Sequence, residues 1–166
     1  MNKSNKMDSI TQIDHTITRG VIAYTSKKPE RLDHERGREF YNIIKYGDGS
    51  RTISVHTEID DRPSVMRDAT YTVDNNWMPQ DCFVRLTVGD KFMGSGWFKF
   101  YETSAECETF TALEGRVSQN YKLKHGPLKS FQNHAIACDS WHFSHYDLSM
   151  GPGEQRIQEI LLCSPD

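Results

Sequence analysis

The sequence predicts a mainly β protein, an antiparallel meander that forms a barrel or half-barrel, with one helix near its C-terminal end. Three observations lead to this prediction. Apolar and polar residues alternate with a period of two through most of residues 16–123, which is typical of strands with one buried face. Short turns separate the alternating segments, which favours antiparallel pairing of sequential strands. After residue 125 the alternation stops, and the next stretch favours a helix.

The alternating segments supply about eight strands in sequence order. They are 16–25, 38–46, 50–59, 66–74, two strands within 81–101, then 105–113 and 114–123. The first pair is joined by a polar connection, and later pairs by GDG, DDRPS and NNWMPQ. Glycine, proline and asparagine are residues that tight turns need. A meander of this length hides its edges by curling, which favours a barrel or half-barrel.

The segment MGSGW, residues 93–97, interrupts a strand with two glycines, Gly94 and Gly96. A glycine inside a strand indicates a bend, a bulge or a close approach of another backbone. We expect these two glycines to permit the bend of a closing barrel. The alternative is that they leave room for a ligand.

The C-terminal part differs from the rest in its pattern. HGPLKS ends the meander, residues 131–148 favour a helix, and 155–163 is apolar enough to return as a strand. The chain stops at LLCSPD without a polar tail, so we expect either a fragment or a protein whose last strands are missing.

Composition narrows the classes of function. With 36% hydrophobic and 26% charged residues in 166, the chain suits a single β-barrel-like domain over 15–166, after a flexible N-terminal arm over 1–14. The net charge of −3, with both signs interspersed, argues against a nucleic-acid partner. The polar start has no apolar core of a signal peptide, and no apolar run approaches the roughly 20 residues that span a bilayer. We therefore expect a cytoplasmic protein with no membrane partner.

The four cysteines are widely spaced and form no CxxC pair, which argues against a structural zinc site. In a reducing compartment we expect them to be free thiols. The sequence also lacks a P-loop, a GxGxxG and a GxSxG motif. Any enzyme here is therefore expected to need no cofactor.

The stretch HAIACDSWHFSHYDLSM, residues 134–150, is the densest group of potentially reactive side chains. On a helix, one stripe would carry His134, Cys138, Trp141, His142 and His145. A metal site there lacks a third protein ligand, and no HExxH motif is present, so no metal is expected. Two interpretations stay open: acid–base chemistry by the histidines, or histidines that are hydrogen-bonded at the edge of a core.

Under the acid–base interpretation, the candidate catalytic residues are His142, His145, Tyr146 and Asp139. The candidate ligand-binding residues are Tyr71, Arg85, Trp97, His134 and Trp141. Trp141 would form a packing wall, because an amphipathic aromatic suits a site that is apolar in body and polar at its tip. Tyr71, Arg85 and Trp97 are the candidates for the opposite wall.

The run RDATYTVDNNWMPQDCFVRLTVGDKFMGSGWFKF, with the strand pair YTVD…W.P.DCFVRL, resembles poorly characterised bacterial lipocalin-like proteins. The resemblance covers roughly residues 16–125 and extends to GPGEQRI. It implies a curved antiparallel sheet around a small hydrophobic molecule, and it assigns no catalytic residue. Such proteins are expected to continue with further strands after CSPD. A homodimer mate or partner chain would then complete the barrel.

Three classes of function follow. The leading one is the binding of a small hydrophobic or aromatic molecule inside a lipocalin-like barrel. The alternative is a cofactor-free lyase, isomerase or cyclase that uses histidine acid–base chemistry on such a ligand. The third is an interaction protein whose open sheet edge pairs with another chain. A pocket with a perturbed histidine favours the enzyme, whereas a long bare edge strand favours the interaction protein.

Overall fold

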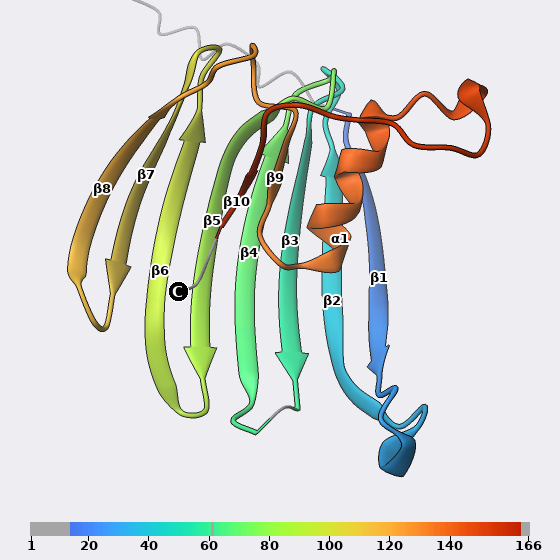
Figure 1. The fold of residues 1–166 in the computed structure, drawn as a ribbon, viewed down its shortest axis with the longest axis vertical. Helices are drawn as coiled ribbons and strands as arrows, with labels where there is room; N and C mark the ends of the chain where they lie inside the picture. The colour runs from blue at the N-terminus through green and yellow to red at the C-terminus, as the bar shows by residue number, and fades with distance from the viewer. Residues whose placement is uncertain (1–13, 61, 164–166) are drawn as a thin grey trace, which may run out of the picture.

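The computed structural model describes residues 14–60 and 62–163, which form a curved β-sheet with a C-terminal segment packed against it (Figure 1). Residues 1–13 of the expected N-terminal arm lie outside the described residues. The strands of the sheet are β1 (Thr16–Thr25), β2 (Glu35–Lys45), β3 (Arg51–Ile59), β4 (Val65–Val73), β5 (Pro79–Val88), β6 (Lys91–Phe100), β7 (Ser104–Thr111) and β8 (Gly115–Lys122).

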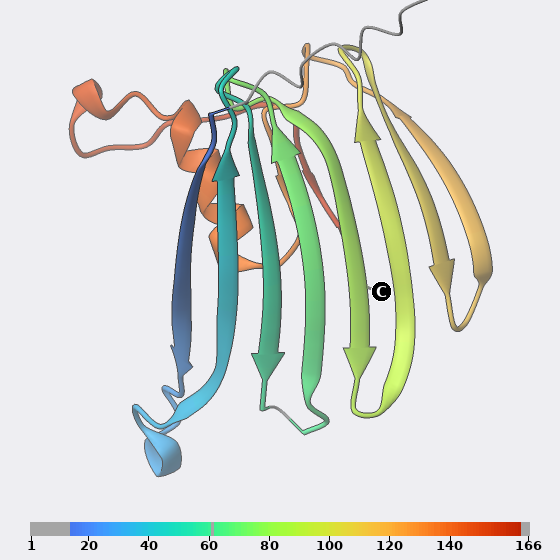
Figure 2. The ribbon, with the colours of Figure 1, turned by 180° about the vertical axis from the view of Figure 1, so that it is seen from behind.

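The eight strands lie in the sheet in the order in which they occur in the chain. All neighbouring pairs are antiparallel. Among the described residues β1 and β8 are not paired with each other, so the sheet is open (Figures 1 and 2). The prediction of a mainly β antiparallel meander is confirmed, and of the two expected forms the structure has the half-barrel.

The strand bounds agree with the predicted ones to within a few residues. The largest difference is at β2, which begins at Glu35 rather than at 38 because β1 continues to pair with it, through a register shift, as far as Thr25. The turn between β2 and β3 is closed by hydrogen bonds from Tyr46 N to Ser50 O and from Gly49 N to Tyr46 O, both 2.9 Å. Gly49 has a φ of 87°, a conformation that favours glycine.

The two faces of the sheet differ in composition. Ile53, Tyr71 and Cys82 lie directly opposite one another on β3, β4 and β5 and are almost fully buried. Their neighbours along the strands, such as Ser54 and Phe83, point to the other face and are exposed. We call the buried side the inner face and the other the outer face. This alternation is the period-two pattern of the sequence.

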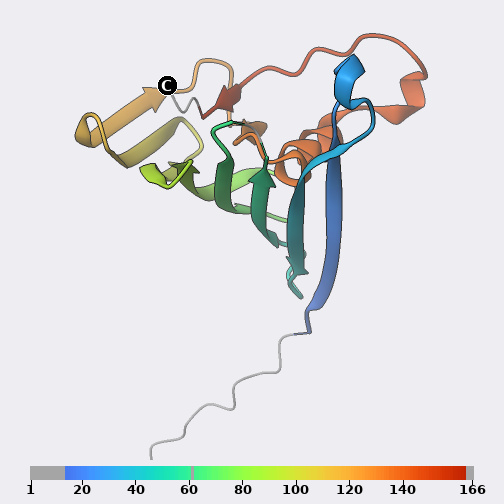
Figure 3. The ribbon, with the colours of Figure 1, turned by 90° about the horizontal axis from the view of Figure 1, so that it is seen from below.

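The inner face is covered by the C-terminal segment, which lies inside the curve of the sheet (Figure 3). Its elements are β9 (Ser130–Gln132), α1 (Ile136–Asp139), the 3-10 helices Ser140–His145 and Leu148–Met150, and β10 (Ile160–Leu162). β9 and β10 pair in parallel as a separate two-stranded sheet. A C-terminal helix is therefore present, and the predicted return strand 155–163 is reduced to three residues.

The helix is much shorter than the predicted range 131–148. Residues 131 and 132 belong to β9, and His134 has a φ of 66°, which no right-handed helix contains. After α1 the chain tightens into a 3-10 helix. The hydroxyl groups of Ser140 and Ser144 donate to carbonyls three residues earlier, at 3.0 and 2.7 Å, and such bonds compete with regular α-helical geometry.

The glycines of MGSGW make room for a neighbouring strand. A Cβ on Gly94 would lie 2.9 Å from the backbone oxygen of Phe110 and 3.3 Å from Thr111 Cα. A Cβ on Gly96 would lie 2.9 Å from Thr109 Cγ2. These contacts are with β7, and a Cβ on Gly96 would also lie 3.0 Å from Phe98 Cε2 on β6. Close packing against neighbouring residues, rather than space for a ligand, explains the missing side chains.

We expect Gly94→Val to lower the free energy of unfolding by about 1–3 kcal/mol, because β7 backbone must move to admit the side chain. Urea denaturation measures this loss. Gly153→Val is the matched control, since nothing lies within 4 Å of a Cβ at that position. Equal stabilities of the two variants would contradict the close-approach explanation.

Candidate functional site

The buried carboxylate of Glu39 fixes the C-terminal segment to the sheet. Glu39 on β2 is fully buried, with no exposed surface. Its oxygens accept hydrogen bonds from the backbone N–H groups of Ile136 (3.1 Å) and Ala137 (2.6 Å), which begin α1. Tyr24 O–H (2.5 Å) and Thr57 O–H (3.2 Å) also donate to Oε2. A side chain remote in sequence thus satisfies N–H groups at the start of the helix.

The Tyr24 hydroxyl is held in its neutral form by this arrangement. Burial raises the pKa of Tyr24, and the hydrogen bond to Glu39 raises it further. The phenol therefore stays a donor across the physiological range. Both oxygens of Glu39 accept hydrogen bonds, so the side chain is fixed between the sheet and the start of α1.

A second buried polar group lies just before the helix. Asn133 is almost fully buried; its amide donates to Cys82 Sγ at 3.4 Å, and its side-chain oxygen accepts from Ala135 N at 3.1 Å. The Asn133 backbone N–H donates to Asp139 Oδ1 at 2.9 Å. Burial raises the pKa of Asp139, and the bond from Asn133 opposes that effect. Asp139 therefore closes a structural turn.

The three histidines of the stretch do not form one stripe. His134 Nε2 lies 2.8 Å from the carbonyl oxygen of Cys163, next to β10. His142 Nδ1 is hydrogen-bonded to the carbonyl of Asp139, and its ring lies 5.6 Å from the ring of Tyr146. Each of these histidines therefore has a local partner.

His145 differs from the other two histidines. Its Nε2 is buried and has no hydrogen-bond partner among the described residues. Burial lowers the pKa of His145, which favours the neutral ring. Backbone groups of Trp77 and Lys129 oppose the shift and place the ring near the turn between β4 and β5.

Trp141 and Tyr71, which were predicted to form opposite walls of a pocket, pack directly against each other. Their ring centroids are 5.6 Å apart, and Trp141 also packs edge-on against Trp77 at 5.7 Å. Arg51 lies over the Trp77 ring, 3.9 Å from its centroid, in cation–π geometry. Tyr71 is 2% exposed. These rings pack against one another as part of the core.

Arg85 and Trp97 lie on the outer face, opposite to Tyr71. Arg85 is exposed and its guanidinium is 4.8 Å from the centroid of the Phe92 ring. Trp97, 43% exposed, faces Phe83 across the β5–β6 pair. The expectation that both residues share a wall with Tyr71 is therefore corrected. In β5 and β6, Arg85 and Trp97 are each adjacent in sequence to an inward residue, so their side chains point to the outer face.

Part of the inner face is left uncovered by the C-terminal segment. Along β3 the burial of inward side chains falls from complete at Ile53 to partial at Ile59. The same change occurs along β4 and β5 toward the same end of the sheet. Figure 1 shows the C-terminal segment over the upper part of the strands and the lower part free of it. We call this area the open inner surface; its residues are Ile59, Val65, Arg67, Leu86 and Val88.

Arg67 is the charged member of the open inner surface. Its Nη1 donates to the carbonyl of His134 at 2.9 Å, which fixes the side chain at the boundary between the surface and the C-terminal segment. Burial raises the pKa of Asp139 and of Cys163, and the positive charge of Arg67 opposes that rise in both groups. The result is an apolar surface with a fixed cation at one end.

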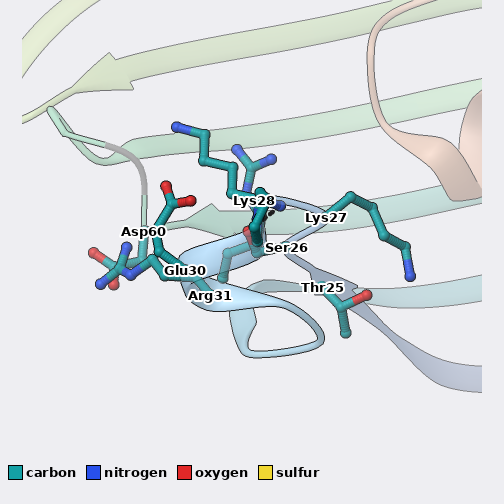
Figure 4. Close-up of a pocket in the computed structure, with 9 residues that line it drawn as sticks. Thr25, Ser26, Lys27, Lys28, Glu30, Arg31 and Asp60 are labelled. Atoms are coloured by element: carbon teal, nitrogen blue, oxygen red, sulfur yellow. Dashed lines mark hydrogen bonds between the residues drawn. The ribbon is translucent and has the colours of Figure 1, made fainter.

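A pocket of about 720 Å³, lined mainly by polar and charged residues, lies at the edge of the sheet, in the connection between β1 and β2 (Figure 4). It is lined by Thr25, Ser26, Lys27, Lys28, Pro29, Glu30, Arg31, Arg36 and Asp60. Buried Ser26 holds the connection through backbone hydrogen bonds with Asp33 and His34, both 2.9 Å. The lining carries charges of both signs, unlike the apolar cavity that the sequence predicts.

The four cysteines are free thiols in the structure. Burial raises the pKa of Cys138 to about 12, and it raises the pKa of Cys82 as well. Neither thiol is ionised at neutral pH, so neither is a nucleophile. Within residues 14–60 and 62–163, no group of three or more His, Cys, Asp or Glu side chains could hold a metal ion.

Sequence reasoning missed Glu39, Asn133 and Arg67. Glu39 had no distinctive signal, because its partners at the start of α1 lie almost a hundred residues further along the chain. Asn133 had none, since its role depends on two backbone segments that meet only in the fold. Arg67 lies on the same strand face as Tyr71, and its position at the boundary of an uncovered area comes from tertiary structure.

Comparison with known proteins gives no match to this chain: no family model, no curated protein and no solved structure is significantly similar to it. None of the helices in the described part of the chain is long and apolar enough to cross a membrane.

Proposed function

We propose that the protein binds a small molecule with a hydrophobic or aromatic body and an anionic end, within the half-barrel, at the open inner surface. The observation that supports this proposal is the loss of burial along β3, β4 and β5 beyond the edge of the C-terminal segment. Ile59, Val65, Leu86 and Val88 supply apolar contacts there. This ligand class is the one that the lipocalin-like resemblance implies, with an anionic end added. The resemblance and a cytoplasmic location are also parts of the proposal.

Arg67 gives the proposed site its preference for an anion. A guanidinium has several N–H donors, and the bond to the His134 carbonyl orients it without neutralising it. A ligand carboxylate would form a charge-assisted hydrogen bond with it, and such bonds contribute about 1.5–3 kcal/mol. The apolar body would lie along Leu86 and Val88, away from the C-terminal segment.

Dodecanoate and dodecanol are matched probes for this site, because they differ mainly in the charge of one end. We expect Arg67→Met to weaken dodecanoate binding about tenfold, as the loss of one charged hydrogen bond predicts, and to leave dodecanol binding nearly unchanged. Leu86→Asp should weaken both probes. Isothermal titration calorimetry measures the affinities, and Phe83→Asp on the outer face is the control.

Two results would contradict the proposal. One is the absence of binding of both probes to the wild-type protein. The other is equal weakening by Leu86→Asp and Phe83→Asp, which would mean that the inner face is not the site. Thermal melting of each variant separates a loss of binding from a loss of fold.

The second candidate function, a cofactor-free lyase, isomerase or cyclase, draws its support from His145. A neutral imidazole with a buried, unpartnered Nε2 is a base that can accept a proton. His142, Tyr146 and Asp139 are already engaged in local contacts. Native mass spectrometry of protein from its own host would identify a bound molecule. Conversion of that molecule, abolished by His145→Gln, would favour the enzyme over the binding protein.

A further inference from the structure

The first strand of the sheet leaves a long edge unpaired. β1 has ten residues and, in the described part of the chain, pairs only with β2. The backbone N–H and C=O groups of every second residue therefore point away from the sheet. Natural edges are usually protected by proline, lysine, bulges or short length. β1, TITRGVIAYT, has no proline or lysine and a single charge, Arg19, and its register shift lies at its last residues, Tyr24 and Thr25.

The opposite edge of the sheet is better protected. β8, GRVSQNYK, is shorter and carries two cationic side chains, Arg116 and Lys122. Arg116 Nε donates to Glu108 at 3.1 Å, so the outer face of this edge carries an ion pair. The charges of β8 disfavour the addition of a further strand. The contrast indicates that β1 is the edge suited to pairing.

Apolar side chains gather beside the β1 edge. On the outer face, Val21 is 56% exposed and lies directly opposite Phe40, which is 38% exposed. In Figures 1 and 2 the loop that carries the 3-10 helix Leu148–Met150 extends beyond β1, but Figure 3 shows it well apart in depth from the start of the strand. A partner paired with β1 would cover Val21 and Phe40.

We infer that the partner is a second copy of this chain, joined through antiparallel pairing of β1 with β1 about a two-fold axis. Such an interface is self-complementary, so each residue of β1 must be compatible with the residue that it faces in the β1 strand of the second copy. With the axis at Val21, this residue faces itself and Arg19 faces Ala23. The two arginines therefore stay apart, and apolar residues meet on the outer face.

Because the two strands run in opposite directions, the Thr16 end of one copy lies beside the Thr25 end of the other. Two sheets joined in this way form one continuous sheet, with both open inner surfaces on the same side.

Multi-angle light scattering of the full chain tests this inference. At about 100 µM the wild-type protein should have twice the monomer mass of 19.2 kDa. Val21→Lys should yield the monomer mass, with a dimer dissociation constant raised by about tenfold or more, because it places two ammonium groups opposite each other. The exposed position of Val21 lets the monomer keep its fold, which circular dichroism verifies.

Gln119→Lys on the exposed β8 edge is the matched control and should leave the dimer intact. A monomeric wild-type protein at this concentration would overturn the inference. So would a Val21→Lys variant that remains dimeric. Dissociation by Gln119→Lys alone would assign the interface to β8 and overturn it as well.

Discussion

Glu39→Ala is expected to lower the free energy of unfolding by about 3–5 kcal/mol, because it leaves several buried donors without an acceptor. The carboxylate accepts from the N–H groups of Ile136 and Ala137 and from the hydroxyls of Tyr24 and Thr57. Thr57 and Ala137 are buried, so their donors lose an acceptor that solvent does not readily replace. Equilibrium urea denaturation, followed by tryptophan fluorescence, measures the loss.

Glu39→Gln is the informative comparison. The amide retains one acceptor oxygen, but its NH₂ group faces N–H donors at the start of α1, so we expect an intermediate loss of about 1–3 kcal/mol. An exposed glutamate on the outer face, Glu58, serves as the control; its replacement by alanine should change stability by less than about 0.5 kcal/mol. If Glu39→Ala were as stable as that control, the carboxylate would not hold the C-terminal segment.

Phe131→Ala is expected to have an effect of similar size, about 3–5 kcal/mol, for an apolar reason. Phe131 on β9 is 2% exposed. Its ring lies 4.7 Å from that of Phe98, 4.9 Å from that of Phe100 and 6.5 Å from that of Tyr71. Removal of the ring leaves a cavity between the C-terminal segment and the sheet. Loss of the segment would also expose the covered part of the inner face.

Phe131→Leu and Phe83→Ala test whether the loss of stability comes from the buried position of Phe131 or from the removal of a phenylalanine ring anywhere in the sheet. Leucine retains most of the volume, so the first variant should lose less than half as much stability as Phe131→Ala. Phe83 is 42% exposed on the outer face, and its truncation should cost less than about 1 kcal/mol. A cost for Phe83→Ala equal to that of Phe131→Ala would contradict the assignment of the two faces.

The two variants also bear on the proposed site. The open inner surface exists because the C-terminal segment ends its coverage near Arg67, and Glu39 and Phe131 hold that segment in place. A variant that loosens the segment should therefore alter probe binding together with stability. Arg67→Met should alter dodecanoate binding with little change in stability, which distinguishes recognition from anchoring.

The candidate site was only partly predictable. Tyr71 and Trp141 were expected to form opposite walls of a pocket, but their ring centroids are 5.6 Å apart and the rings pack directly against each other. The predicted stripe of side chains is not formed, because the prediction assumed that residues 131–148 are one continuous α-helix. Pairing of β9 with β10 and the left-handed backbone of His134 break that period. Local sequence does not reveal either feature, since both depend on a strand almost thirty residues further along the chain.

The sequence by itself determined the sheet. Alternation of apolar and polar residues and short turn sequences depend on neighbours within a few positions, so the eight antiparallel strands and their order could be predicted. Only the tertiary structure decided which strand face is inner, where Arg85 and Trp97 point relative to Tyr71, and how far the C-terminal segment covers the curve. These features depend on contacts such as that of Glu39 with Ala137, ninety-eight residues apart. Such long-range contacts leave no periodic signal, because a single inward glutamate looks the same in sequence whether it anchors a helix or faces solvent.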